Sequence, residues 1–407
     1  MMWRVIGPAL LFSGAAIGTS HLVQSTRAGA LYGLALLIVI ALICILKYPA
    51  FRFGVDYGHA TRRSLLVGYR ELGVWAPLLF ATISLAVFPI IYAALASATA
   101  GIVVAVFGLT WPVPALGLII LVTATALLLA GGYSWLDIVN RVLVAFLVVS
   151  TLIVTALVLP RVDWGTLGAT GWVSDPKAIL FIVALAGFMP NPLDVSVTLS
   201  MWTAEAERAE GGSKVSLHET RLTFLSGYLL TAFLALCFCI IGAGVMHARQ
   251  IAPETSAPGF AQQIVALYSE TLGQGAALLA AIAALSVMAT TVLAAIDIGG
   301  RNAASTWQQI ARDDSEAVFQ RVYRITIPAM IVATAAVLYL FTSTFTALLD
   351  LATSAAFVAA PVIATLNHLV VTRCAMPEDS RPGRAMRALN IAAIIVMTSL
   401  AAVYFLM

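Results

Sequence analysis

Long apolar windows separated by short polar connections dominate the chain from end to end. A membrane-spanning helix needs about 20 consecutive apolar residues, because the hydrocarbon core of a bilayer is about 30 Å thick. The pattern predicts an all-α polytopic membrane protein with about eleven transmembrane helices. The predicted spans lie near residues 6–26, 31–51, 76–107, 113–131, 138–160, 178–201, 222–246, 272–298, 325–343, 346–371 and 387–406.

The first window loses its apolar character before it has crossed a membrane. Its middle reads Gly18-Thr19-Ser20-His21. Glycine carries a large entropy cost in a helix, and Thr and Ser side chains compete for backbone hydrogen bonds. Such a run is favourable where the helix unwinds and a sheltered polar cavity satisfies the freed backbone groups. We therefore expect a discontinuous helix whose broken middle faces a substrate.

The sixth window carries a second interruption, which reads Met189-Pro190-Asn191-Pro192. Two prolines remove two backbone donors and clash with the preceding turn, so that an unbroken helix is not expected. Interruptions at matching places in the two groups of five spans indicate an inverted-repeat transporter with a site near the membrane midplane. The expected organisation is a single transmembrane domain, residues 1–407, with repeats at approximately 1–160 and 176–371 and an additional helix at 387–407.

Composition supports a membrane protein and excludes other classes. Hydrophobic residues make up 61% of the chain, charged residues 10%, and the mean hydropathy is +0.99, which is outside the range of soluble domains. A net charge of only +3 gives no reason to expect a nucleic-acid partner. The expected partners are the lipid bilayer and a small ion or small molecule. The sequence shows no nucleotide loop, zinc signature or nucleophile and base pair, so neither an enzyme nor a resident cofactor is expected.

Positively charged loops predict the orientation. With the N-terminus inside, all but four of the 22 lysines and arginines lie in or beside inner loops, and Lys47 is counted among them. The positive-inside rule therefore predicts a cytoplasmic N-terminus and an outer C-terminus, in the cell (inner or plasma) membrane. A signal peptide is not expected, because no small-residue cleavage site leads into a soluble chain. The four exceptions are Arg27, Arg161, Lys177 and Arg249.

Three side chains beside the interruptions are candidates for chemistry. The thioether of Met189 and the imidazole of His21 suit transition-metal ions, although both residue types also serve as ordinary packing residues. An ionisable group at the depth of Asp194 needs a partner, water or a proton. We expect Asp194 to be a cation ligand or a proton carrier, with a helix-capping role as the alternative.

Two further aspartates lie at the edges of predicted spans. Asp297 ends the eighth window and Asp350 lies near the start of the tenth. Both are weaker candidates for a proton relay, and the alternative is that they cap helices or pair with loop arginines. Arg27 is not expected to pair with Asp194, because the first and sixth spans run in opposite directions past their breaks.

The interrupted spans also carry residues in a familiar order. Gly7-Pro8, Gly18-Thr19-Ser20-His21 and Ala28-Gly29-Ala30-Leu31-Tyr32-Gly33 follow one another at a fixed spacing, and Ala186-Gly187-Phe188-Met189-Pro190-Asn191 lies in the sixth span. These segments resemble the GPG, DPGN, AGAxYG and AxxMPH motifs of the Nramp (natural resistance-associated macrophage protein) family of proton-coupled divalent-metal transporters. The resemblance implies the LeuT, or amino-acid/polyamine/organocation, fold with a five-plus-five inverted repeat and one extra helix.

The resemblance also implies a ligand set that this chain keeps only in part. Family members hold the metal with the Asp and Asn of DPGN, the Met of MPH and a carbonyl three residues before it. The corresponding residues here are Gly18, His21, Met189 and the Ala186 carbonyl, and Asn191 replaces the family histidine. Without the carboxylate, a divalent ion loses several kcal/mol of Coulomb attraction even at an effective dielectric of about 20. His21 or Asp194 must compensate, or the substrate differs.

Two functions remain open from the sequence. The first is a proton-coupled secondary transporter of a transition-metal ion, with Ala186, Met189, His21 and Asp194 around the metal. The alternative is a metal-independent transporter of a small organic or anionic solute, such as an amino acid or carboxylate. The missing acid at Gly18 and the small-residue loop after it favour this alternative. Either cargo is expected between Gly18, Thr19, Ser20 and His21 on one side and Ala186, Met189 and Asn191 on the other.

Overall fold

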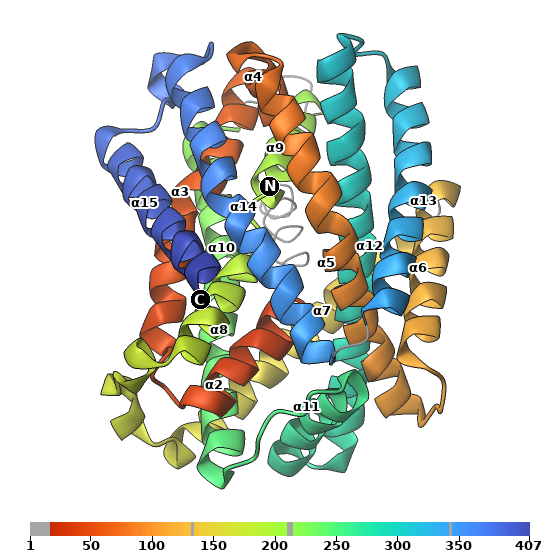
Figure 1. Ribbon diagram of the computed structural model, residues 1–407, viewed down its shortest axis with the longest axis vertical. Helices are drawn as coiled ribbons and strands as arrows, with labels where there is room; N and C mark the ends of the chain where they lie inside the picture. The colour runs from red at the N-terminus through yellow and green to blue at the C-terminus, as the bar shows by residue number, and fades with distance from the viewer. Residues whose placement is uncertain (1–16, 132–133, 210–214, 342–343) are drawn as a thin grey trace.

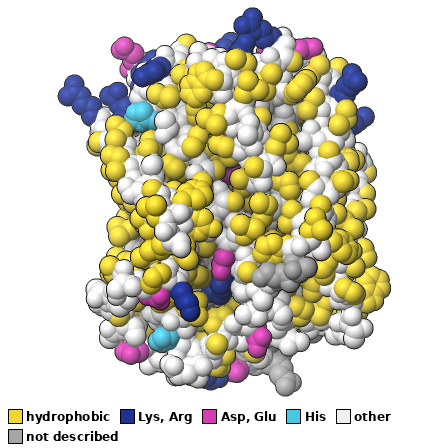
Figure 2. Space-filling view, in the orientation of Figure 1, with side chains coloured by type: hydrophobic (Ala, Val, Ile, Leu, Met, Phe, Trp, Pro, Cys, Tyr) yellow, Lys and Arg dark blue, Asp and Glu magenta, His cyan; other side chains and the backbone are white. Residues whose placement is uncertain are grey.

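The computed structural model describes residues 17–131, 134–209, 215–341 and 344–407 (Figure 1). Within these ranges every regular element is helical, which confirms the all-α prediction. Nine of the described helices are long and apolar enough to cross a membrane. Figure 2 shows the corresponding surface, with apolar side chains across the middle of the visible face and charged side chains gathered toward its top and bottom.

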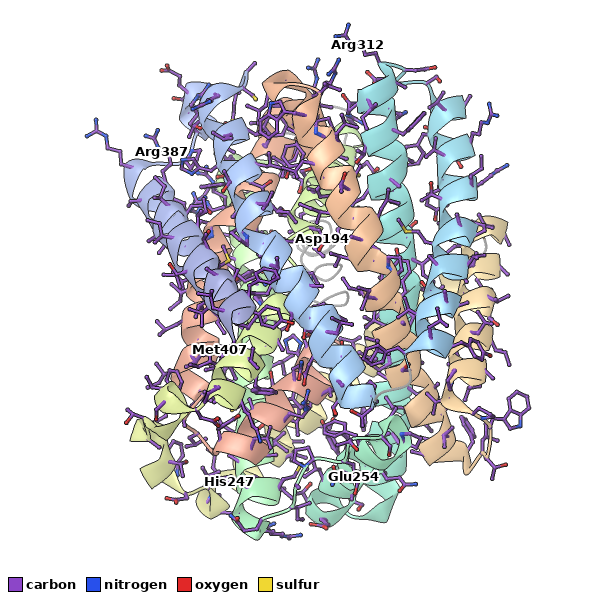
Figure 3. All side chains as sticks on the ribbon, in the orientation of Figure 1. Asp194, His247, Glu254, Arg312, Arg387 and Met407 are labelled. Carbon is purple, nitrogen blue, oxygen red and sulfur yellow. The ribbon has the colours of Figure 1, made fainter. Side chains whose placement is uncertain are left out.

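The long helices follow the apolar windows of the sequence. Helices α12 and α13 extend beyond their windows into polar sequence, at the end of the molecule that carries Arg312 (Figures 1 and 3). We call this the Arg312 end. The opposite end, which carries Glu254, is the Glu254 end. The long helices are α3 (Leu37–Thr61), α5 (Trp75–Phe107), α6 (Val113–Ala130), α7 (Ser134–Val158), α10 (Leu217–Ile241), α12 (Gln274–Ala311), α13 (Glu316–Leu340), α14 (Phe345–Arg373) and α15 (Arg384–Leu406).

The interruption of the sixth span is confirmed. Helix α8 (Pro176–Phe188) ends at the break, residues 189–194 are non-helical, and α9 (Val195–Ala209) continues the span. Proline at the start of α8 occupies a position where its missing N–H is not needed, whereas Pro190 and Pro192 fall where a continuous helix would need donors. The two prolines therefore account for the break.

The first span is described only from Ile17 onward, and the N-terminal part of its window lies outside the described residues. Ile17 and Gly18 are non-helical, and a π-helix (Ser20–Ser25) follows directly and leads into α2 (Thr26–Tyr32). A π-helix in place of an α-helix is a local irregularity that occurs frequently at functional sites. The irregular backbone lies where the polar run of the sequence predicted it.

Two helices were not predicted. Helix α4 (Leu65–Leu72) connects α3 to α5, and α11 (Ala257–Leu272) packs against α5 and α12 at the Glu254 end (Figure 1). Both are shorter than a membrane span, so the search for long apolar windows passes over them. The start of α11 has a clear local cause, because the side chain of Ser256 accepts a hydrogen bond from the Gly259 N–H at 3.2 Å.

Close backbone contacts hold the broken span in place. Helix α3 packs along α9, and α14 packs along α8. A Cβ atom on Gly54 would lie 2.2 Å from the Ser196 carbonyl oxygen, and one on Gly187 only 1.7 Å from the Thr353 carbonyl oxygen. Glycine at these two positions lets α3 and α14 approach the two halves of the span from opposite sides of the break.

Candidate functional site

A small internal cavity lies beside both irregular segments. Its walls include Gly18, Thr19 and Ser20 from the first span and Asn191 and Asp194 from the break in the sixth. Apolar side chains of α5 and α12 complete the lining. The cavity volume of about 50 Å³ is enough for a few water-sized molecules, since one water needs about 10–15 Å³ by this measure. The two predicted interruptions therefore meet at one site.

Asp194 supplies a carboxylate to this cavity. Figure 3 shows Asp194 near the middle of the molecule, between α14 and α5 in this view and far from both charged ends. Among the described residues its carboxylate forms no salt bridge within 4 Å, and its backbone carbonyl accepts a hydrogen bond from Val197 N–H at 2.9 Å. An ionisable group at this depth is costly unless a cation, water or a proton accompanies it.

Asn191 adds a hydrogen-bond donor to the same cavity. Its side chain is 4% exposed, and its amide nitrogen Nδ2 has no hydrogen-bond partner in the described part of the chain. A buried donor without a partner costs about 1–3 kcal/mol. Water or an oxygen atom of the cargo in the cavity would satisfy it.

Lys47 does not belong to an inner loop, so this part of the loop prediction is wrong. It lies inside α3 with 1% of its surface exposed. Its Nζ donates hydrogen bonds to the backbone carbonyls of Ala186 (3.0 Å), Gly187 (3.1 Å) and Asn191 (2.7 Å). Coulomb attraction also links it to Asp194. The available signal was that Lys47 falls within the 31–51 apolar window, where an ionisable residue indicates a functional site.

The other predicted metal ligands do not line the cavity. His21 points to α10, where its Nε2 donates to the Thr231 carbonyl at 2.9 Å. Its Nδ1 is then the acceptor for the Ser20 hydroxyl at 2.7 Å. Met189 is fully buried in the hydrophobic core, and the Ala186 carbonyl accepts from Lys47. A ligand role for these three residues stays a prediction, and it requires their present contacts to change.

Asp350 pairs with Arg27 toward the Glu254 end. The guanidinium donates from Nη1 to Oδ1 at 2.6 Å and from Nη2 to Oδ2 at 2.9 Å, and Gln24 Nε2 also donates to Asp350 at 3.0 Å. The Arg27 guanidinium carbon lies 5.1 Å from the ring centre of Phe181. Arg27 thus has a partner other than Asp194, as expected. A proton-relay role for Asp350 stays a prediction.

Asp297 lines a second, larger cavity at the Arg312 end. This polar cavity has a volume of about 710 Å³, and we call it the vestibule. Asp297 accepts hydrogen bonds from Arg301 Nε at 2.8 Å and Tyr323 Oη at 2.6 Å. Ile298, its neighbour on α12, lines the small cavity. The vestibule therefore lies next to the small cavity along α12, and a relay role for Asp297 stays a prediction.

Comparison with solved structures defines the class of the protein. The fold matches a manganese transporter of Eremococcus coleocola, solved in complex with an aromatic bis-isothiourea substituted compound, at a TM-score of 0.70 and 15% identity, covering 98% of this chain and 86% of that one. It also matches MhsT, solved with L-phenylalanine, at a TM-score of 0.67 and 14% identity over 98% of both chains. The chain is therefore an integral membrane protein with the LeuT fold.

Sequence comparison defines the family. The natural resistance-associated macrophage protein-like family matches residues 9–407, and the chain belongs to this family. An uncharacterized protein of Pasteurella multocida (strain Pm70), PM0681, is 33% identical over 376 residues, which cover 91% of this chain and 86% of that protein. The predicted membership of the Nramp family is confirmed. At 14–15% identity the solved structures establish the fold, and they do not establish the cargo.

Proposed function

We propose that this protein is a secondary transporter that carries a transition-metal ion, with the cargo bound in the small cavity between the two irregular spans. The observation that carries the proposal is the Asp194 carboxylate, which lines a water-sized cavity in mid-bundle without a salt bridge among the described residues. Membership of the Nramp-like family supports a metal cargo.

Electrostatics supports a cation beside Asp194. At a separation of 4 Å and an effective dielectric of about 20, a divalent ion and one carboxylate attract each other by about 8 kcal/mol. Thr19, Ser20 and Asn191 line the same cavity, and neutral oxygen atoms of these residues or water would complete the shell around the ion. In this proposal Asp194 replaces the carboxylate that Gly18 lacks.

The surroundings of the cavity support alternating access. The vestibule offers a polar approach from the Arg312 end. Toward the Glu254 end, the first span is tied to α14 by the ion pair of Arg27 and Asp350. Separation of this pair, with closure of the vestibule, would expose the cavity to the other side. Transporters of this architecture work by such rocking around a fixed midplane site.

Uptake of Mn²⁺ into proteoliposomes tests the proposal. Wild-type protein is expected to carry Mn²⁺ down an imposed gradient, and Asp194→Asn is expected to weaken Mn²⁺ binding at least about 100-fold, equivalent to about 2.7 kcal/mol. The matched control is Asp379→Asn, which removes a carboxylate from an exposed loop at the Arg312 end. Absence of Mn²⁺, Zn²⁺ and Cu²⁺ transport by wild-type protein, or equal uptake by D194N, would reject the metal site.

Proton coupling is part of the same proposal, with Asp194 as ligand or proton site and Asp297 and Asp350 as weaker relay positions. Acidification of the liposome lumen during Mn²⁺ uptake would support it. Uptake that proceeds with an unchanged internal pH would show a metal carrier without proton coupling.

One observation favours a second cargo class. The cavity is lined by the Asp194 carboxylate and by Asn191, whose amide nitrogen has no hydrogen-bond partner among the described residues, so it offers both an acceptor and a donor, as a site for a small polar organic solute would. Competition distinguishes the two. Amino acids and carboxylates that inhibit Mn²⁺ uptake, or that enter liposomes in chelated buffer, would favour the organic cargo.

A further inference from the structure

Three backbone carbonyls surround the end of the Lys47 side chain. Two of them, from Ala186 and Gly187, belong to the last turn of α8, and the third, from Asn191, lies on the other side of the break. The last carbonyls of a helix have no intrahelical donors and carry the negative end of the helix dipole. The break thus creates a cluster of carbonyl oxygens inside the bundle.

Such a cluster would bind a cation if Lys47 were absent. Hard cations are bound by carbonyl oxygens, and unwound carbonyls at broken spans are the groups with which transporters of this architecture coordinate ions. Nζ lies 2.7–3.1 Å from the three oxygens, which is hydrogen-bonding contact with all three. No carboxylate of the described residues forms a salt bridge with it. The carbonyls are therefore its direct partners.

We propose that the Lys47 ammonium is a tethered cation that fills a cation site formed by the carbonyl oxygens of Ala186, Gly187 and Asn191. The protein then needs no alkali or divalent ion at this position to hold the broken span together. The inference goes beyond the proposed function, because it concerns the carbonyl oxygens of the break and not the Asp194 carboxylate in the cargo cavity, and it holds for a metal or an organic cargo alike.

The alternative is that Lys47 is an ordinary helix cap. A cap would contribute stability, and its loss would simply lower stability. A tethered cation makes a different prediction, since a free cation of the right size must be able to replace it. Chemical rescue therefore separates the two roles.

The test uses Lys47→Ala in the full-length protein, with thermal unfolding in detergent as the readout. In choline chloride, K47A is expected to unfold at least about 5 °C below the wild type. Propylammonium chloride restores the atoms that the substitution removes, so it is expected to recover at least half of this loss. The uncharged analogue 1-propanol is expected to recover none.

Two matched measurements complete the test. Lys47→Met keeps the apolar stem but leaves no room for a free ammonium, so K47M is expected to be destabilised and not rescued. The unfolding temperature of the wild type is expected to be the same in sodium chloride, potassium chloride and choline chloride. If K47A does not survive extraction in choline chloride, extraction in propylammonium chloride is expected to recover monodisperse protein.

Several results would overturn the proposal. The first is a K47A protein as stable as the wild type in choline chloride, and the second is a destabilised or unextractable K47A that no ammonium or alkali ion recovers. The third is rescue by 1-propanol equal to rescue by propylammonium. The fourth is a wild type whose thermal stability requires sodium or potassium. None of these measurements depends on transport. A failed Mn²⁺ uptake experiment would therefore leave this inference intact, and a failed rescue would leave the proposed function intact.

Discussion

Two residues of opposite charge, Lys47 and Asp194, lie at the break in the sixth span, and they differ in their partners. Lys47 has three carbonyl partners, whereas Asp194 faces a water-sized cavity. A buried charge costs several kcal/mol unless it has partners. Lys47 is therefore already compensated, and Asp194 is the residue with capacity left for a cation.

His21 provides a test of which side chains hold the metal. Because both ring nitrogens are engaged by Ser20 and Thr231, we expect His21→Ala to lower the free energy of unfolding by about 1–3 kcal/mol, since the variant loses both of these buried hydrogen bonds. Its Mn²⁺ affinity, measured by calorimetry, should change less than tenfold. The control is His218→Ala on the exposed start of α10. A stable H21A protein with strongly weakened binding would instead establish His21 as a ligand.

The individual contacts of the site could be predicted only in part. Asp194 is predictable because a carboxylate is conspicuous in an apolar window, and Asn191 because it replaces the histidine of the MPH motif. The hydrogen bond from His21 joins residues 210 positions apart, and no local pattern encodes it. Lys47 was missed because it stands near the end of its window, where charged residues usually belong to a loop.

At the scale of elements, the broken sixth span depends on close backbone packing as well as on prolines. A Cβ atom at Gly187 would overlap the Thr353 carbonyl of α14, and backbone cannot move aside as a flexible side chain can. We expect Gly187→Ala to push α8 from α14 and to destabilise the protein by about 1–3 kcal/mol or more, measured by thermal unfolding. Loss of Mn²⁺ binding should accompany it.

A matched glycine provides the control for this prediction. Gly168 lies in the exposed connection between α7 and α8, where a Cβ atom would meet nothing within 4 Å. Gly168→Ala should change stability by no more than about 0.5 kcal/mol. If G187A proved as stable and active as G168A, the close approach of α8 and α14 would not be needed.

The elements themselves were largely predictable because bilayer thickness sets a minimum length for each span. The prolines likewise determined the position of the sixth-span break. Helix α11 is not predictable in this way, since it has only 16 residues and no predicted apolar window covers it. The ends of α12 and α13 beyond their apolar windows have local caps, because Arg312 adopts the left-handed conformation after α12 and the Ser315 side chain accepts a hydrogen bond from Val318 N–H at 3.4 Å at the start of α13.

At the scale of the whole molecule, the charge distribution distinguishes the two ends. Arg312 and Arg387 lie at the end that also holds the vestibule (Figure 3), and the positive-inside rule assigns that end to the cytoplasm. We therefore expect the vestibule to open to the inside. The ion pair of Arg27 and Asp350 then lies on the outer side of the cavity.

Cysteine labelling in intact cells tests this orientation. A cysteine at exposed Thr170, at the Glu254 end, should react with a membrane-impermeant maleimide, and one at exposed Glu378, at the Arg312 end, should react only after lysis. The four native cysteines are buried, and burial raises the pKa of Cys374 to about 12, so the background should be low. The reverse labelling pattern would show an inverted topology.

The central claim is that the cavity between the two irregular spans holds the cargo, with Asp194 as its charged ligand. A structure of the wild-type protein soaked with Mn²⁺, with anomalous scattering used to find the metal, tests this claim most directly. We expect one anomalous peak in the cavity, in contact with the Asp194 carboxylate and with Lys47 still on its three carbonyls. A peak coordinated by Met189 and His21 with Asp194 uninvolved, or no peak in the cavity at saturating Mn²⁺, would contradict it.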